Sequence, residues 1–416
     1  MSRPTSRITK AFVAVGAAAL ALTVTAPLAA NADPSTTGRA NQISGSDTIQ
    51  DVLNGITNGY SANGVARAAT QTDLGSWNAF GAPDPITPKA GGQAVGRPHG
   101  SGDGVKALSA SWNPANDIFV QTVSGVTTSY DLKNVGTGTD NDGVREFDYA
   151  RSSSKPGTTV IPGTANDKLT YVPFARDAVA PVLQKGAGTT YNSVTNLTSD
   201  QLNAIFGDGT SDDGKITLVS NKPVYNTAPG TSTNAQLPLN PVLPQASSGT
   251  RSFFLSAIGV GTVGTWVTGA TTGGVAENDA SALNTAGNIA PFSAGQWISQ
   301  KKGTVASTFT GSNSATLSLL QANGVLATTG TTDATLAPNA AYYGSATAEP
   351  TAATFRFARD TYIVYPTQNA ATADSYARGL GQKVVGVNST SVVTEFGFLR
   401  LNYTGTTGRY ASNWTN

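Results

Sequence analysis

One arrangement of apolar and polar residues recurs along the chain. In the first copy, an apolar run around Ile43 leads into a polar loop, Gly45 to Thr48, and apolar residues then follow at Ile49, Val52 and Ile56. A spacing of three to four residues is typical of one face of a helix, and a short apolar run before a glycine-rich turn is typical of a strand. The pattern therefore predicts a strand, a polar loop and a helix start.

The same arrangement returns at residues 99–108 and 246–255, where glycine and serine again precede apolar residues at helical spacing. Between these copies lie strand-like runs at Phe147–Ala150 and Leu169–Ala175. Because strands that alternate with helices are typical of α/β proteins, we predict an α/β fold with largely parallel sheets.

Two segments far apart in the chain resemble each other. Phe174–Ala180 and Phe357–Tyr365 both begin Phe-Ala-Arg-Asp and are otherwise mostly apolar. This likeness would suit two strands that lie side by side where the chain crosses between two halves of the molecule. Two unrelated strands explain it equally well, because a repeat this short does not establish a duplication.

Two regions are less regular. Residues Asn221–Pro244 are rich in proline, asparagine and threonine and are interpreted as a long loop. Residues Gly303–Thr354 are rich in threonine, alanine and glycine, with one patch at Leu317–Leu326 interpreted as helical.

The composition favours an extracellular protein over a cytosolic one. Of 416 residues only 12% are charged, against about 25% in a typical soluble domain. The polar surface is therefore built from Thr, Ser, Asn, Gln and Gly, which favours an extracellular protein. The net charge is +1 and the basic residues are scattered, so we predict no nucleic-acid partner.

The first 32 residues are predicted to be a signal peptide. Arg3, Arg7 and Lys10 precede an apolar stretch, and Ala30 to Ala32 forms an Ala-x-Ala cleavage sequence, so cleavage is expected near Ala32–Asp33. The alternative, a membrane anchor, is disfavoured because the stretch is short and is followed by Pro27. We predict a secreted protein without a membrane span in its mature chain.

The sequence contains no cysteine, and His99 is its single histidine. This composition excludes disulfides, thiolate or multi-histidine metal sites, and lipid attachment through a lipobox cysteine. Segments 140–143 and 208–213 have some character of a calcium loop but lack its terminal glutamate. A glycine pattern at 259–264 follows a predicted helix, not a strand, and so does not indicate a dinucleotide site. We predict no metal and no cofactor.

The three polar loops are the candidate chemistry. Each opens a helix, where backbone N–H groups are unpaired and carry partial positive charge. A single loop of this kind is most simply a helix cap, whereas three that converge would form an anion site. The candidate donors of these loops are Ser46, Thr48, Ser101, Gly102, Ser248, Gly249 and Thr250.

A fourth candidate element stands at the end of a predicted strand and consists of Arg151, Ser152 and Ser153. The guanidinium of Arg151 could make a forked contact with an oxyanion. A surface or interlobe ion pair explains it equally well.

In order along the chain, these motifs resemble the phosphate-binding proteins of phosphate ABC importers, in the type 2 periplasmic-binding-protein superfamily. The sequence as a whole resembles a secreted actinobacterial member of this family. The likeness extends from Gln42 to Leu401. The matching segments are Gly45–Thr48, Gly100–Lys106, Ala150–Pro156, Tyr171–Val179, Leu197–Gly209, Ser248–Phe254 and Glu395–Leu401.

The resemblance implies two α/β lobes joined by a hinge, with an interlobe cleft. Lobe I would comprise residues 33–176 plus 362–416, and lobe II residues 177–361. The resemblance also implies that backbone N–H groups, hydroxyls, an arginine and an aspartate hold the phosphate. Asp47 and Asp103 are the candidate acids, with a helix first-turn role as the alternative for Asp103.

Two departures from the family pattern stand out. The stretch Leu243–Ser247, before the Ser-Gly-Thr loop, lacks the usual arginine, so Arg251 and Arg151 are the candidates to replace it. The usual acid at the strand end is replaced by Arg151, Ser152 and Ser153.

We therefore predict a monomeric, secreted solute-binding protein that captures a small oxyanion, phosphate, with an ABC permease as its partner. It is predicted not to be an enzyme. The alternative from another class is a secreted surface-interaction or adhesion protein on the same scaffold with no transport role. A phosphatase-like activity is disfavoured because the sequence offers neither a catalytic triad nor a set of metal ligands.

Overall fold

The structure is a computed structural model that describes residues 33–34, 38–123, 125–132, 144–271, 274–309 and 314–415. The predicted signal peptide and the calcium-like segment 140–143 lie outside the described residues.

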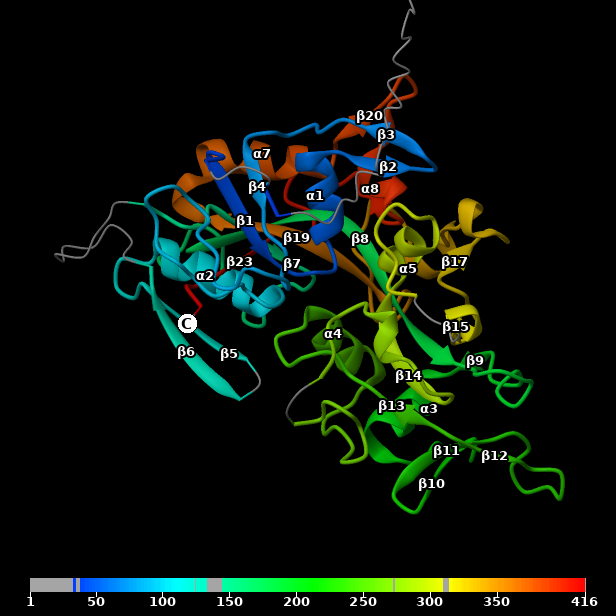
Figure 1. Cartoon of the computed structure of the whole chain (residues 1–416). Coiled ribbons are helices and arrows are strands. Elements are labelled where there is room, and N and C mark those ends of the chain that lie inside the picture. The colour runs from blue at the N-terminus through cyan, green and yellow to red at the C-terminus, as the bar shows by residue number, and fades with distance from the viewer. Residues whose placement is uncertain are drawn as a thin grey trace, which may run out of the picture.

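A large twisted sheet runs through the molecule and connects its two parts (Figure 1). The strand order is β13-β14-β8-β19-β7-β1-β4, and β15, β22 and β23 also pair with β8. The bounds are β1 Asn41–Gly45, β4 Leu74–Ser76, β7 Tyr149–Ser152, β8 Leu169–Gln184, β13 Asn240–Pro241, β14 Asn288–Ser293, β15 Leu317–Leu319, β19 Ala358–Pro366, β22 Leu399–Arg400 and β23 Tyr410–Ser412.

The prediction of largely parallel sheets was wrong for the middle of this sheet. Strands β7, β1 and β4 are parallel, as are β13 and β14, but β8 pairs antiparallel with both β14 and β19. The reason is topological, because the chain leaves one part of the molecule along β8 and returns along β19. Two strands that cross in opposite directions must pair antiparallel.

These two crossing strands contain the repeated Phe-Ala-Arg-Asp segments, so the prediction of side-by-side strands is confirmed. Their register sets Arg359 opposite Asp177 and Asp360 opposite Arg176. Both pairs form buried salt bridges, of 3.0 Å for Arg359–Asp177 and 2.8 Å for Arg176–Asp360. The repeat thus gives the two crossing strands two matching buried ion pairs.

The three predicted helix starts are confirmed at α1, α2 and α4, and the strand predicted at Phe147–Ala150 begins two residues later, as β7. The helices are α1 Gln50–Asn58, α2 Ser101–Trp112, α3 Ser199–Asn203, α4 Gly249–Ile258, α5 Ala294–Lys301, α6 Ala340–Tyr343, α7 Ala370–Leu380 and α8 Val392–Glu395. No helix in the described part of the chain has the length and apolar character that a membrane span requires.

Two predictions about the irregular regions were wrong. The stretch Asn221–Pro244 contains β11 and β12 of a small antiparallel sheet, as well as β13. The patch Leu317–Leu326 forms β15 and β16 in place of a helix, because Leu317 to Leu319 pairs with the buried strand β8. In the first stretch β11 and β12 pair with each other and with the neighbouring β10, whereas in the second pairing with a distant strand outweighed the local signal.

The remaining strands form small two- or three-stranded sheets at the periphery. They are β2 Tyr60–Ala62, β3 Val65–Arg67, β5 Ile118–Val123, β6 Val126–Asp131, β9 Asn196–Leu197, β10 Ile216–Val219, β11 Lys222–Asn226, β12 Gln236–Pro238, β16 Gln321–Ala322, β17 Thr328–Thr329, β18 Ala337–Pro338, β20 Val384–Val385 and β21 Thr390–Ser391.

The apolar core is divided between two parts of the molecule. Two clusters of buried side chains come from residues 43–175 and 362–398, joined by Val305, and two others come from residues 178–357. Figure 1 shows the blue β1 and α1 and the orange α7 above the green β10 to β13, with β8 running from the upper group toward the lower one. The exact lobe boundaries at 176/177 and 361/362 stay predictions.

Candidate functional site

The N-termini of α1, α2 and α4 meet at the junction of the two parts. Thr48, just before α1, and Thr250, in the first turn of α4, lie 202 positions apart in sequence, yet their Oγ1 atoms are 3.2 Å apart. Ser101 begins α2, and its Oγ lies 3.0 Å from the Oγ of Ser153, which follows β7. All four side chains are buried.

Glycines allow the first two loops to pack this closely. Gly45 has a φ of +111°, and a Cβ there would lie 2.6 Å from the carbonyl oxygen of Arg151. Gly104, in the first turn of α2, packs directly against the Cα of Gly45, so a side chain at either residue would separate α2 from the loop before α1. The glycines of both motifs therefore serve the close approach of backbones.

Gly249 has the same role for the third loop. A Cβ on Gly249 would lie 2.7 Å from Ser101 Oγ and even closer to Ser153 Oγ. The start of α4 therefore lies directly against the two serines of the other part of the molecule. At this point the backbone of one lobe contacts the hydroxyls of the other.

Glu277 and Arg359 complete the cluster. Glu277 Oε2 accepts hydrogen bonds from Thr48 Oγ1 at 2.7 Å and from Thr250 Oγ1 at 2.6 Å. The Nη2 of Arg359 donates to Thr250 Oγ1 at 2.6 Å and contacts Asp177 Oδ2 at 3.0 Å. One carboxylate and one guanidinium thus hold the hydroxyls of both lobes together.

Several polar atoms in this cluster are buried without a partner. Among the described residues these include Ser46 Oγ, Asp47 Oδ1, Glu277 Oε1, and both Nε and Nη1 of Arg359. The two amide atoms of Gln245, which lies close to Gly100, are also buried and unpaired. Since an unsatisfied buried polar group costs about 1–3 kcal/mol, a cluster of donors and acceptors of this kind is typical of a ligand site.

The electrostatics of the cluster are dominated by burial. Burial raises the pKa of Asp47 well above its usual range, and the neighbouring carboxylate of Glu277 raises it further. Burial opposes ionisation of Glu277 too, but Arg359 and the hydrogen bonds of this carboxyl outweigh it and lower its pKa. Of the two carboxyls, Asp47 is therefore the one that burial and its neighbour shift toward the protonated form, and Glu277 the one shifted toward ionisation.

A family model described as "PBP superfamily domain" matches residues 98–380, which is more than half of the chain. The chain belongs to this family. The superfamily and the two-lobed type 2 periplasmic-binding-protein fold inferred from the motifs are thereby confirmed, and in this PBP superfamily protein the cluster lies where the two lobes meet.

Solved structures with some similarity include an ABC-type phosphate transport receptor from Vibrio cholerae, with 15% identity, a TM-score of 0.42, and coverage of 86% of this chain and 99% of that chain. A putative phosphate ABC transporter substrate-binding protein with bound phosphate from Clostridium perfringens has 14% identity, a TM-score of 0.42, and coverage of 87% and 99%. A phosphate-binding protein from Stenotrophomonas maltophilia has 13% identity, a TM-score of 0.44, and coverage of 87% and 91%. Similarity this low supports no argument about the ligand. The sequence matches none of the curated proteins.

Arg151 and Arg251, the two arginines predicted to bind the ligand, instead stabilise the loops of this PBP superfamily protein. Arg151 is fully buried and donates to the carbonyl oxygens of Gly45, Ser46 and Trp77 and to the hydroxyl of Ser76. Arg251 donates to the carbonyl oxygens of Pro244, Gly269 and Ala270. Both guanidinium groups thus bind the protein's own backbone.

Other predicted residues have local roles in the structure. Ser248 Oγ caps α4 by accepting from the backbone N–H of Arg251 at 2.9 Å. Ser152 Oγ closes a turn by donating to the carbonyl of Ser154. Asp103 accepts from the backbone N–H of His99 and from Gln121, while Gly102 is exposed at the first turn of α2.

Sequence reasoning missed Arg359, Asp177 and Glu277. The first two belong to the repeated Phe-Ala-Arg-Asp segments, so their signal was present but was interpreted only as a crossing of strands. Glu277 stands in Ala276–Asp279, after a glycine-rich stretch, and no motif marks it. No group of three or more His, Asp or Glu side chains in the described ranges is placed to hold a metal ion.

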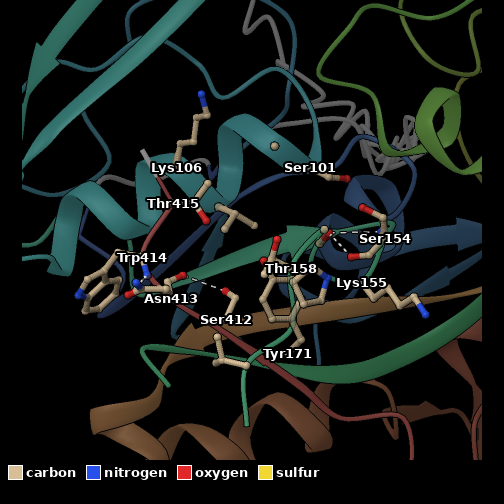
Figure 2. Close-up of a pocket in the computed structure, with 16 residues that line it drawn as sticks. Ser101, Lys106, Ser154, Lys155, Thr158, Tyr171, Ser412, Asn413, Trp414 and Thr415 are labelled. Atoms are coloured by element: carbon tan, nitrogen blue, oxygen red, sulfur yellow. Dashed lines mark hydrogen bonds between the residues drawn. The ribbon is translucent and has the colours of Figure 1, made fainter. Parts of the chain in front are cut away.

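A separate cavity of about 430 Å³ adjoins the α2 end of the site (Figure 2). It is lined by α2, by the segment after β7 and by the C-terminal residues around Trp414. Figure 2 shows Ser101 and Trp414 near opposite ends, with Lys106 and Lys155 extending in different directions. Since these lysines do not converge, the interlobe cluster is the better candidate for an anion site.

Proposed function

We propose that this protein is a secreted solute-binding protein that captures a small oxyanion, phosphate, between its lobes and releases it unchanged to an ABC permease. The observation that carries the proposal is the meeting of Thr48 and Thr250, each at a helix start, beside the buried guanidinium of Arg359. Membership of the PBP superfamily supports a binding role.

The chemistry of the cluster suits a compact oxyanion. Helix N-termini supply backbone N–H groups and partial positive charge, and the surrounding hydroxyls add short, adjustable donors. Arg359 contributes a charged fork whose Nε and Nη1 are unpaired in the structure. The proposed ligand set is Ser46, Thr48, Ser101, Ser153, Gly249, Thr250, Gln245 and Arg359.

The carboxyl groups of Asp47 and Glu277 favour phosphate over sulfate. A carboxylate can accept a hydrogen bond from a protonated phosphate oxygen, whereas sulfate at neutral pH has no proton to donate and would be repelled. Arg151 and Arg251 are assigned to support of the loops, because their donors already bind carbonyl oxygens.

Capture requires the lobes to open and close about β8 and β19. Contacts such as Thr48–Thr250 join the two lobes directly, so ligand entry must separate them. The adhesion alternative would not require converging, unpaired polar atoms at the lobe junction. The phosphatase alternative lacks support, because the ring of His99 packs at a tilt against Phe80 with centroids 4.7 Å apart and its Nε2 lies 3.9 Å from Asp84.

Isothermal titration of the mature protein with phosphate, arsenate, sulfate and a phosphonate tests the proposal. We expect heat with phosphate and much less with sulfate. Thr250→Val should weaken phosphate binding at least tenfold, whereas Thr57→Val, which removes a buried hydroxyl outside the site, should not. Absence of heat with every oxyanion would refute the proposed function.

A further inference from the structure

We infer that capture of the oxyanion is coupled to the uptake of one proton by the Asp47–Glu277 pair. The inference rests on the proposed function and extends it, because it assigns Glu277 as a residue that controls both affinity and its dependence on pH.

Glu277 occupies the place of an anion between the two lobes. Its Oε2 accepts hydrogen bonds from Thr48 and Thr250, which belong to the two different lobes. These hydroxyls are also proposed donors to the bound oxyanion. Each threonine hydroxyl has a single proton to donate, so it cannot serve both acceptors at once. An incoming oxyanion must therefore take these hydrogen bonds from Glu277.

Arg359 is the cation of this cluster. Arg359 contacts both threonines through Nη2 and is already paired with Asp177 at 3.0 Å. Once the oxyanion also binds Arg359, this guanidinium faces the ligand as well as the Asp177 and Glu277 carboxylates. Its single positive charge cannot balance all of them in a buried site.

The remaining charged groups near the pair do not relieve this excess. Asp51, one turn further along α1, and Asp279, which borders the same cavity as Asp47 and Glu277, add negative charge. Arg151 lies behind the loop, where its donors bind carbonyl oxygens and the Ser76 hydroxyl. The titratable and charged groups around the pair are thus Asp51, Arg151, Asp177, Asp279 and Arg359.

The displaced carboxylate stays buried. Glu277 is 5% exposed and Asp47 is 6% exposed, each has one oxygen that receives no hydrogen bond from a donor, and the two carboxyls are close enough to share a proton. A buried carboxylate that loses its hydrogen-bond donors and gains an anionic neighbour favours its protonated form. A proton from solvent then binds a carboxyl oxygen of the pair. A cavity of about 240 Å³ beside both residues provides its path.

Titration calorimetry in several buffers of different ionisation enthalpy counts the protons taken up. The measurement is made with inorganic phosphate well above its second pKa, so that the ligand itself remains a dianion. For the wild-type protein we expect uptake of one proton. We also expect a dissociation constant that rises about tenfold for each unit of pH.

Two isosteric variants test the assignment. In Glu277→Gln and in Asp47→Asn, the new amide can donate a hydrogen bond to the remaining carboxylate, which then has no need of a proton. Both variants should show little proton uptake and a flat dependence of affinity on pH. Glu277→Gln should also bind phosphate more tightly than wild type at alkaline pH, an improvement that a merely structural role for Glu277 does not explain.

Glu395→Gln is the matched control, because Glu395 pairs with Arg67 in a cluster apart from the site. It should keep the wild-type proton count. Equal proton uptake in wild type and both site variants, with phosphate still bound, would overturn this inference and leave the proposed function standing. No binding by the wild-type protein at any pH would overturn the proposed function, and this inference with it.

Discussion

Replacement of Arg359 by glutamine tests the central arrangement of the site. In the structure Arg359 is 3% exposed, lies on the returning strand β19 and contacts Asp177, Thr48 and Thr250. The substitution retains hydrogen-bonding capacity but removes the positive charge from a buried position. The Asp177 and Glu277 carboxylates would then share a site without their cation.

The substitution should lower two quantities by different amounts, the folding stability and the affinity for phosphate. Removal of one partner from a buried ion pair costs about 3–5 kcal/mol of folding stability, because the other charge stays buried and uncompensated. Loss of a charge-assisted hydrogen bond to the ligand costs about 1.5–3 kcal/mol, which corresponds to roughly 10- to 150-fold in affinity. Arg359→Gln should therefore lower both stability and phosphate affinity.

The related ion pair on the same two strands supplies the control. Arg176 pairs with Asp360 at 2.8 Å and donates to the carbonyls of Tyr343, Ser345 and Ala348. Arg176→Gln should therefore destabilise the protein at least as much as Arg359→Gln. Its phosphate affinity should stay within about twofold of wild type, since Arg176 contacts none of the proposed ligand residues in the described structure.

Urea unfolding followed by circular dichroism measures the stability of each variant, and calorimetric titration with phosphate measures affinity under conditions where both are folded. Wild-type affinity in Arg359→Gln would refute the placement of this guanidinium at the ligand. An equal loss of affinity in both variants would show that the effect reaches the site through the hinge strands.

Two further predictions concern the loops and the acid pair. Gly249→Ala places a methyl group 2.7 Å from Ser101 Oγ, so we expect a loss of phosphate affinity above tenfold with an unchanged circular dichroism spectrum. Gly261→Ala, at a residue with open space around it, is the control, and equal affinities in the two variants would contradict the predicted contact. The pKa of Asp47 is raised in the folded protein, so ionisation of this carboxyl costs free energy in the folded state. The free energy of unfolding should therefore fall as pH rises above the usual carboxyl range. Asp47→Asn should remove this loss, so its advantage in urea midpoint over wild type should grow with pH, and parallel pH profiles would contradict the assignment.

The local elements of the site could be predicted from the sequence. The helix starts at α1, α2 and α4 follow from glycine, hydroxyl residues and apolar spacing, all within about ten residues. Such signals depend on backbone geometry and capping, which act over short distances, so neighbouring residues suffice to determine them. The superfamily followed from the order of the same loops.

The chain's own sequence therefore determined which helices begin with anion-binding loops and that two Phe-Ala-Arg-Asp segments would form strands. Only the tertiary structure decided which arginine faces the cleft. Neighbouring residues on a strand point to opposite faces, and the register of β8 against β19 directs Arg359 to Thr250 and Arg176 to Tyr403. The tertiary structure likewise decided the role of Glu277. Its hydrogen bond with Thr48 joins residues 229 positions apart in different lobes, so it depends on how the lobes pack and not on any local pattern.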